Sequence, residues 1–206
     1  DEARNDLFAS LEPTERRPNL DPALLAALAA AHGAAPTPED VFRYVYAVLY
    51  APTYREAYAQ FLRIDFPRVP FTADADLFGQ LAALGERLVA LHLLRSPELD
   101  PPLARFQGDG DRRVARTQRA GFGYDPETQR VGINPDQWFA PVPPDVWAYQ
   151  IGGYQVCEKW LKDRRDRTLT LDEVRTYCRI VTALARTIEL QADIDALYPS
   201  VEETLV

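Results

Sequence analysis

The sequence of 206 residues contains no methionine, only two cysteines and only two histidines. Because a natural open reading frame normally supplies a first methionine, a chain that begins Asp1-Glu2-Ala3 is expected to be a piece of a longer protein. Cys157 and Cys178 cannot build the disulfide framework of a small secreted domain, and no Cys/His spacing suits zinc. We therefore expect two reduced core thiols, which are typical of a cytoplasmic protein.

Long hydrophobic runs are also missing. The apolar stretch Leu24–Ala31 is far shorter than the ~20 residues of a membrane helix, and Asp21 and Pro22 precede it instead of a basic leader. It is therefore neither a membrane anchor nor a signal peptide. We expect a cytoplasmic chain with no membrane partner, and one that is long enough to bury a sizeable core.

The sequence has no evident catalytic constellation. His32 and His92 lie within helical patterns, at positions that suit structural roles. Gly108–Gly110 lacks the further glycine of a nucleotide-binding loop and predicts a turn. Asn134–Trp138 is only faintly similar to the Asn-Pro-Pro-aromatic loop of amino-methyltransferases, so we interpret it as a turn entering a short helix. We predict no catalytic residue, no metal ligand and no cofactor in this chain, and an independent small enzyme would need a site that the sequence does not show.

The charge is mostly acidic but unevenly distributed. A net charge of −8 argues against a simple nucleic-acid binder, which is usually basic. However, residues 105–167 carry eleven basic and nine acidic residues, whereas the remainder carries twelve basic and twenty-two acidic ones. This asymmetry indicates a region that faces a polyanion on an otherwise acidic body.

Helix signals surround a β-rich middle. Thr37 with Pro38, and the capping box of Thr170 with Glu173, each predict a helix start, and Thr72 is expected to cap a third helix. Residues 1–18 are expected to be a linker or irregular, and residues 19–206 a single domain with helices in 19–96 and 154–197. Short strands are predicted within 103–151, at Leu103–Gln107, Val114–Gln118, Arg130–Ile133 and Val146–Ile151. The fold class is α+β, with helical N-terminal and C-terminal parts packed around a small antiparallel β unit of about residues 103–151.

Residues 151–167 combine glycine, aromatic and basic side chains. Gly152-Gly153 predicts a sharp turn from a strand into a helix that starts near Tyr154. Three aromatic side chains are expected in the core: Tyr44, Phe66 and Trp160. The polar face of the helix is either a solvated helix end, with Glu158 and Lys162 paired, or a phosphate-contacting surface. The residues of that surface would be Lys159, Lys162, Arg164 and Arg165.

A second basic stretch begins just after Gly108–Gly110. Arg112, Arg116 and Gln118 alternate along a predicted strand, so they are expected on one side of a hairpin. Arg and Gln can read the edges of guanine and adenine. We therefore predict contacts to DNA bases or grooves, although an exposed hairpin with solubilising arginines would have the same pattern. The predicted contact residues are Arg112, Arg113, Arg116, Gln118 and Arg119.

Three long motifs resemble the C-terminal specificity domain of type ISP restriction–modification enzymes. They are Asp40–Arg55 (DVFRYVYAVLYAPTYR), Phe61–Pro70 (FLRIDFPRVP) and Ile151–Arg164 (IGGYQVCEKWLKDR), and Arg17–Leu20 fits as well. The resemblance covers about residues 17 to 195, with the motifs in the family's order.

The resemblance implies a role within a single long polypeptide. Such enzymes join a nuclease, a helicase-like ATPase and an adenine methyltransferase to this last domain, which recognises the DNA target. S-adenosylmethionine, ATP and Mg²⁺ are then expected on other domains. The implied partners are double-stranded DNA and the methyltransferase domain of the same chain. The alternative is a structural domain whose 151–164 surface docks on the methyltransferase with little base readout. The salt dependence of DNA affinity distinguishes DNA recognition from docking, because phosphate contacts weaken steeply as the salt concentration rises.

Overall fold

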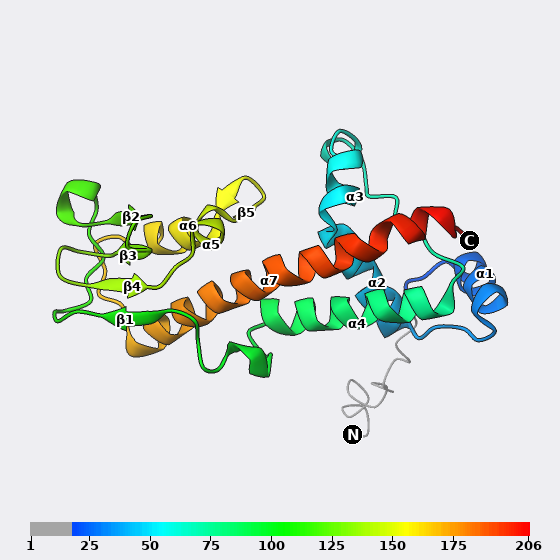
Figure 1. Cartoon of the computed structure of the whole chain (residues 1–206), viewed down its shortest axis with the longest axis horizontal. Helices are drawn as coiled ribbons and strands as arrows, with labels where there is room; N and C mark the ends of the chain where they lie inside the picture. Colours follow the sequence, from blue (N-terminus) through cyan, green and yellow to red (C-terminus); the bar gives the residue numbers. More distant parts are fainter. Residues whose placement is uncertain (1–17) are drawn as a thin grey trace, which may run out of the picture.

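Residues 18–206, which a computed structural model describes, form an elongated molecule of two lobes joined by one long helix (Figure 1). That helix, α7 (Leu171–Glu203), has 33 residues and is about 50 Å long at 1.5 Å per residue. Its first half packs under a β unit and its second half packs with other helices. The α+β prediction is confirmed, and the β unit lies at one end of the molecule. The linker predicted for residues 1–18 lies outside the described residues, except for Pro18.

The helical lobe consists of residues 18–100 and the second half of α7. The Asp21 carboxylate and the Thr37 hydroxyl cap its first two helices by accepting from backbone N–H groups at 2.8 and 3.1 Å. Gly33 ends the first helix with a φ of 78°. The elements are α1 (Pro22–His32), α2 (Pro38–Tyr50), α3 (Pro52–Ala57), a 3-10 turn (Phe61–Arg63), α4 (Ala75–His92) and a second 3-10 turn (Pro97–Leu99).

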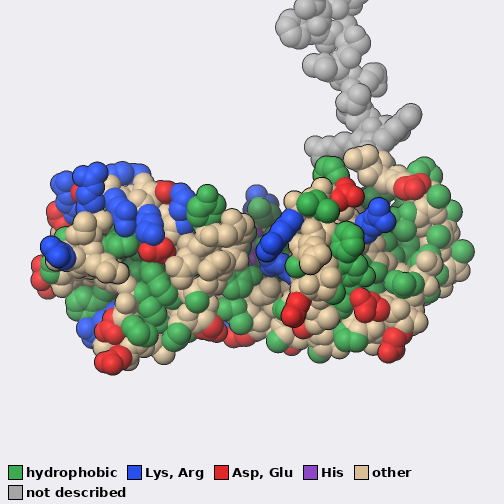
Figure 2. Space-filling model, turned by 90° about the horizontal axis from the view of Figure 1, so that it is seen from above, with side chains coloured by type: hydrophobic (Ala, Val, Ile, Leu, Met, Phe, Trp, Pro, Cys, Tyr) green, Lys and Arg blue, Asp and Glu red, His purple; other side chains and the backbone are tan. Residues whose placement is uncertain are grey.

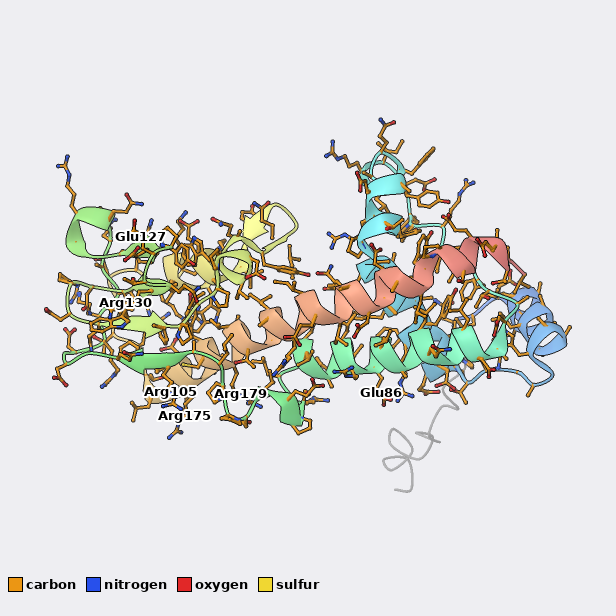
Figure 3. The ribbon with its side chains drawn as sticks, in the orientation of Figure 1. Glu86, Arg105, Glu127, Arg130, Arg175 and Arg179 are labelled. Carbon is orange, nitrogen blue, oxygen red and sulfur yellow. The ribbon has the colours of Figure 1, made fainter. Side chains whose placement is uncertain are left out.

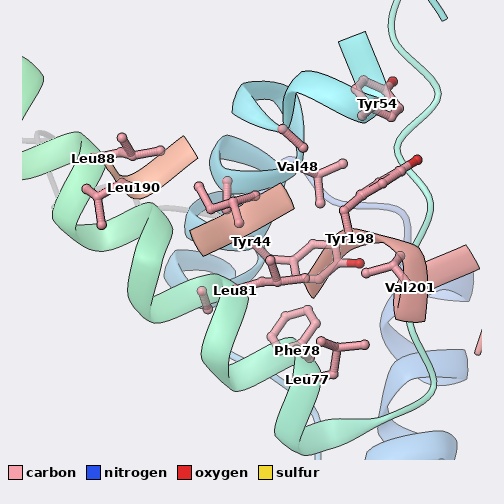
Figure 4. Close-up of a cluster of buried hydrophobic side chains, with 14 of the residues drawn as sticks. Tyr44, Val48, Tyr54, Leu77, Phe78, Leu81, Leu88, Leu190, Tyr198 and Val201 are labelled. Carbon is pink, nitrogen blue, oxygen red and sulfur yellow. The ribbon is translucent and has the colours of Figure 1, made fainter. Parts of the chain in front are cut away.

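Aliphatic side chains and aromatic rings together form the core of this lobe (Figure 4). The ring of Tyr44 stacks on Phe71 and Phe78, with centroids 5.2 and 4.6 Å apart, and thereby connects α2 to α4 and to the chain before it. The Tyr44 hydroxyl donates to the Pro70 carbonyl at 2.9 Å, so its polar end is satisfied although the residue is buried.

The β lobe consists of residues 101–170 and the first half of α7. Its antiparallel sheet has the order β1-β4-β3-β2. The strands are β1 (Arg105–Gln107), β2 (Gly123–Asp125), β3 (Arg130–Gly132) and β4 (Trp138–Ala140). After the sheet come α5 (Pro144–Ala148), the strand pair β5 (Gln150–Ile151) and β6 (Tyr154–Gln155), and α6 (Val156–Lys162). Phe139 and Trp160 contact Tyr177 of α7 with centroids 4.3 and 5.2 Å apart, which connects the sheet and α6 to the long helix.

The strand predicted at residues 114–118 is wrong. The N–H of Val114 donates to the Arg167 carbonyl and the N–H of Ala115 donates to the Ile133 carbonyl, so no single neighbour pairs with this segment. The chain then enters a 3-10 turn, Gln118–Ala120. Consequently Arg112, Arg116 and Gln118 do not share one side of a hairpin. The predictions at β1 and β3 are confirmed in position, each somewhat shorter than expected.

The chain between residues 134 and 156 also differs from the prediction. The turn at Asn134 leads into β4 and not into a short helix. Residues 146–151 contain the end of α5 and then β5, because two prolines start a helical turn at Pro144. Gly152 and Gly153, with φ values of 58° and 82°, turn the chain between β5 and β6, so α6 begins only at Val156.

Asp74, and not Thr72, caps α4. The Asp74 carboxylate accepts from the N–H groups of Asp76 and Leu77 at 2.9 and 3.0 Å. The Thr72 hydroxyl is buried and bonds to the Thr204 hydroxyl at 2.6 Å, so it ties the start of α4 to the end of α7 instead.

The three aromatic residues expected in the core have different outcomes. Tyr44 is fully buried and Trp160 is partly buried against the β-lobe core, as predicted. Phe66 is exposed, and that prediction is wrong. Pro67 and Pro70 keep the segment extended, so the Phe66 side chain is held away from the lobe.

The capping box predicted for α7 is confirmed. The Thr170 hydroxyl accepts from the Glu173 N–H at 3.1 Å, and the Glu173 carboxylate accepts from the Thr170 N–H at 3.0 Å. The helix continues six residues beyond the predicted end at Leu197 and passes through Pro199, because Tyr198 and Val201 are buried in the core. Neither α7 nor any other helix in residues 18–206 is both long and apolar enough to cross a membrane.

Both cysteines are buried free thiols, as the sequence predicted. Burial raises the pKa of Cys157 to about 12 and that of Cys178 to about 11. At neutral pH both are therefore protonated and behave as small apolar side chains of the β-lobe core.

We expect His92 to make the stability of the helical lobe dependent on pH. The Thr187 hydroxyl donates to the Ala183 carbonyl, so it accepts from His92 Nε2 at 2.9 Å, and the Tyr46 hydroxyl donates to Nδ1 at 2.8 Å. Burial lowers the pKa of His92 below 6.5, so the unfolded chain binds the proton more readily. The stability should be full above about pH 6.5 and should fall as the pH drops below it.

Thermal unfolding over a pH series checks this expectation. His92→Gln should show a flatter fall in melting temperature below about pH 6.5 than the unmodified chain. His32→Gln is the control for loss of the other histidine. Equal slopes in all three chains would assign the acid sensitivity to other groups.

Candidate nucleic-acid interface

The structure brings the two basic stretches into one surface of the β lobe. Backbone hydrogen bonds join them: the Val114 N–H donates to the Arg167 carbonyl at 2.9 Å, and the Asp166 N–H donates to the Val114 carbonyl at 2.8 Å. Residues 112–119 contain four arginines and no acidic residue, and residues 159–167 contain five basic and two acidic residues. We call these two segments together the basic surface. Figure 2 shows Lys and Arg side chains gathered over this lobe.

Three arginines of the basic surface are the most available for a ligand. Arg113 and Arg119 are exposed, and no carboxylate oxygen of residues 18–206 lies within 4.0 Å of either guanidinium. Arg116 is 78% exposed in its side chain, and its contact with Asp166 is 3.6 Å long. An exposed pair of that length contributes little, so Arg116 can turn to an anion at small cost.

Arg112 has a structural role. Its Nε donates to the Leu169 carbonyl at 3.0 Å, and its backbone N–H donates to the Gln137 side chain at 2.7 Å. Its φ of 61° lies in the left-handed region and turns the chain between Gly110 and Val114. Arg112 therefore holds the 112–119 loop against the segment that follows α6.

Arg164 is also held by its neighbours. Its guanidinium lies 3.6 Å from the centre of the Trp160 ring and donates to Glu173 Oε1 at 3.1 Å. The Thr170 N–H, and then Arg164 and Arg167, lower the pKa of the Glu173 carboxyl, so this acid stays ionised and keeps both arginines in place. Arg164 and Arg167 thus connect the basic surface to the start of α7.

The lysines of α6 point to solvent with intrahelical partners. Lys162 pairs with Glu158 at 2.7 Å, which confirms the predicted pair, and Lys159 pairs with Asp163. Both pairs are four residues apart and partly exposed, so they hold the lysines only weakly. The lysines can exchange these carboxylates for phosphates.

Arg165 lies at the inner edge of the surface. Its guanidinium is 5.0 Å from the centre of the buried Phe122 ring, and its Nε is buried with no hydrogen-bond partner among the described residues. The cation–π contact favours the orientation in which the guanidinium lies over this ring. Arg165 is therefore a positive charge next to Phe122 without a carboxylate partner among the described residues.

A groove of about 500 Å³ adjoins this surface, and the sequence analysis did not foresee it. Its lining includes Gln118, Tyr124, Arg130, Asn134 and Trp138. Arg130 belongs to β3 (Figure 3), and its guanidinium lies 4.6 Å from the centre of the Trp138 ring. Since Gly132 is opposite Trp138, Arg130 lies diagonally across the strand pair from it. In the sequence, Arg130 and Trp138 lie on either side of a predicted turn, and this spacing could have predicted that they meet across two paired strands.

Metal-binding chemistry finds no support in the described residues. No three side chains of His, Cys, Asp or Glu within residues 18–206 gather as a metal site would require. The chemistry of the basic surface is instead that of anion recognition, with guanidinium forks, two lysines and an amide beside an open groove.

Comparison with known protein families decides what the chain is. The model of the type ISP C-terminal specificity domain matches residues 1–192. The chain belongs to this family. The match confirms the resemblance that the three motifs indicated. A comparison with curated proteins finds no match.

Solved structures similar to this specificity domain are parts of much longer chains. DrdV in a DNA complex is 25% identical, with a TM-score of 0.60 over 84% of this chain and 19% of its own. Two type ISP restriction–modification enzymes share the fold. LlaGI, solved as a nuclease-deletion mutant with a DNA substrate mimic, is 21% identical, with a TM-score of 0.55 over 78% of this chain and 16% of its own. The ATP-dependent LlaBIII, bound to DNA, is 18% identical, with a TM-score of 0.58 over 77% and 11%. The specificity domain thus spans less than a fifth of each.

Proposed function

We propose that this specificity domain binds double-stranded DNA through the basic surface and recognises the target sequence of a longer restriction–modification enzyme. The observation that carries the proposal is the joining of residues 112–119 and 159–167 into one face on a chain whose net charge is −8. Solved proteins with this fold are DNA complexes, which supports the same partner.

We assign the side chains of the basic surface to DNA contacts or to positioning roles according to whether other protein groups already bind them. Arg113, Arg116 and Arg119 are exposed beside the groove, so we assign them to the phosphates and base edges of a DNA groove, and Gln118 and Arg130 to base edges. Lys159, Lys162 and Arg165 are assigned to phosphates. Arg112 and Arg164 position the two loops, because their guanidinium groups already donate to protein carbonyl and carboxylate oxygens.

The rest of the enzyme follows from the family and is part of the same proposal. A methyltransferase domain of the same polypeptide would be the second partner, in the cytoplasm. S-adenosylmethionine, ATP and Mg²⁺ would bind to other domains, and the specificity domain would present the target adenine for modification or cleavage. The acidic remainder of the chain repels DNA, so only the basic surface and neighbouring domains would approach the duplex.

Binding of the chain to random-sequence duplex DNA across a salt series tests the proposal. About five phosphate contacts would give a slope of log affinity against log salt near −4.5 and a loss of about 500-fold between ~50 and ~200 mM salt. Absence of binding at the lowest salt, or binding that does not respond to salt, would contradict it.

The same titration separates DNA contact from docking at α6. Lys159→Ala with Lys162→Ala should reduce the salt slope by about two if both lysines contact phosphates. Arg87→Ala with Arg186→Ala, which removes two paired surface arginines outside the basic surface, is the matched control. An unchanged slope in the lysine variant would favour the alternative, in which the 151–164 surface docks on the methyltransferase.

A further inference from the structure

The helical lobe carries a projection that the proposed DNA interface does not use. Residues 52–70, which contain α3 and the segment after it, extend away from α2 and α7 (Figure 1). Three large apolar side chains are exposed near its tip: Phe61 at 63%, Ile64 at 81% and Phe66 at 89%. Three such residues within six positions are unusual on a free surface, because each exposes apolar area to water.

The projection is held in a defined shape. The Tyr54 hydroxyl donates to the Arg68 carbonyl at 3.0 Å, and the Tyr44 hydroxyl donates to the Pro70 carbonyl at 2.9 Å. Both tyrosine rings are buried, so the core of the lobe holds the end of the extended segment. Two prolines restrict the segment further. The exposed side chains are therefore presented by a rigid support and do not lie on a free loop.

The apolar residues border a concave groove of about 360 Å³. Tyr54 and Tyr58 form its floor with ring centroids 4.9 Å apart, and Phe61, Leu62, Ile64 and Phe66 belong to its lining. A concave, mainly apolar surface accepts a protruding apolar side chain. A wedge inserted between base pairs is convex, so the groove fits protein better than DNA.

Residues 52–70 carry three basic and two acidic side chains, and one of each, Arg68 and Asp65, lines the groove. Arg55, Arg63 and Arg68 are exposed, and none has a carboxylate oxygen within 4.0 Å among residues 18–206. Glu56 and Asp65 are the acidic residues of the projection. The surface is thus apolar at the centre and slightly positive at its border, which complements a partner with an apolar knob surrounded by acidic side chains.

We propose that residues 52–70 are the surface on which another folded domain of the same polypeptide docks, and that this domain presents an apolar knob with an acidic border. The chain spans only 11% to 19% of the solved chains that share its fold. In such a polypeptide most residues belong to other domains, and at least one of these domains must contact the specificity domain. The inference rests on the proposed function in one respect, namely that the chain is part of a longer enzyme. It moves the docking surface from α6 to the opposite lobe and leaves α6 to DNA.

The test uses the full-length polypeptide of the gene, divided before residue 1 into an N-terminal part and this chain. Binding of the two parts is measured by calorimetry in the absence of DNA. Ile64→Asp and Phe66→Asp should each weaken the association about 10- to 100-fold. Leu93→Asp, at an apolar position that is 54% exposed just after α4, is the control and should have little effect. Because the tip residues are exposed, the melting temperature of each variant should match that of the unmodified chain.

Other occupants give different results. Equal affinities for the variants and the unmodified chain would overturn the proposal, as would a gene that encodes no further domain. Hydrogen exchange of residues 58–68 that slows with duplex DNA alone would indicate a DNA wedge instead. Self-association of this chain that Phe66→Asp abolishes would indicate a second copy. Ile64→Asp and Phe66→Asp should leave DNA binding by this chain unchanged, so failure of the docking proposal and failure of the DNA proposal are separate outcomes.

Discussion

Replacing Arg113, Arg116 and Arg119 together by glutamine should lower the affinity of the chain for duplex DNA on the order of 100-fold at low salt. The three side chains are exposed on the 112–119 loop, and among residues 18–206 only Arg116 has a carboxylate oxygen within 4.0 Å, at 3.6 Å. Their charge is therefore available to phosphates and base edges. If each replaces one condensed counterion, the slope of log affinity against log salt should also decrease by about three.

The control for this variant removes the same charge elsewhere. Arg95, Arg175 and Arg186 are exposed arginines outside the basic surface, and their replacement by glutamine changes the net charge by the same amount. Fluorescence anisotropy with a labelled duplex over a salt series measures both variants. Similar losses in the two triple variants would mean that the total charge governs binding, and the assignment of the 112–119 loop would be wrong.

Gly85→Ala should destabilise the chain by about 2 kcal/mol or more, although alanine is the better helix former by about 1 kcal/mol. Gly85 lies in the middle of α4, where α4 crosses α2. A Cβ at this position would overlap the Arg43 carbonyl oxygen, 2.7 Å from the Arg43 carbonyl carbon and 3.3 Å from the Ala47 nitrogen. These are backbone atoms of a helix, so they cannot turn aside as a flexible side chain would, and the two helices must separate.

Gly79 is the matched control on the same helix. Apart from the neighbouring backbone of α4, no atom of residues 18–206 lies within 4 Å of a Cβ built at Gly79, so only the helix propensity acts there. Gly79→Ala should therefore stabilise the chain by about 0.5–1 kcal/mol. Urea unfolding of both variants measures the pair. A stabilising Gly85→Ala would show that α2 and α4 can separate at small cost, and that their close backbone approach contributes little.

Both predictions depend on contacts between segments that are distant in the sequence. From the sequence, replacing either helical glycine by alanine is expected to stabilise the chain. The close approach of α2 makes the substitution destabilising at Gly85, and α2 does not approach Gly79 in this way. In the same way, the two basic stretches each had an equally simple interpretation as solvated charge. Their backbone pairing places them in one surface, and this surface is what distinguishes a polyanion interface from scattered charge.

The sequence alone determined the features that arise within a few residues. The capping box at Thr170, the helix start at Thr37, the buried cysteines, the Glu158–Lys162 pair and the α+β class are all local patterns, and all are confirmed. The family follows from three motifs that also lie within short stretches. Local hydrogen bonding and periodicity carry this information without reference to the rest of the chain.

Tertiary structure decided how those pieces are used. Residues 114–118 have the alternation of a strand, but Arg167 and Ile133 bond to successive residues there and prevent a ladder. Arg112 and Arg164 have the chemistry of DNA contacts, yet Leu169, Trp160 and Glu173 hold their guanidinium groups. Phe66 has the chemistry of a core residue, yet two prolines and the bonds to Tyr54 and Tyr44 keep its segment on the surface. In each case a neighbour from elsewhere in the chain set the environment of the side chain, and residue type and spacing alone do not contain that environment.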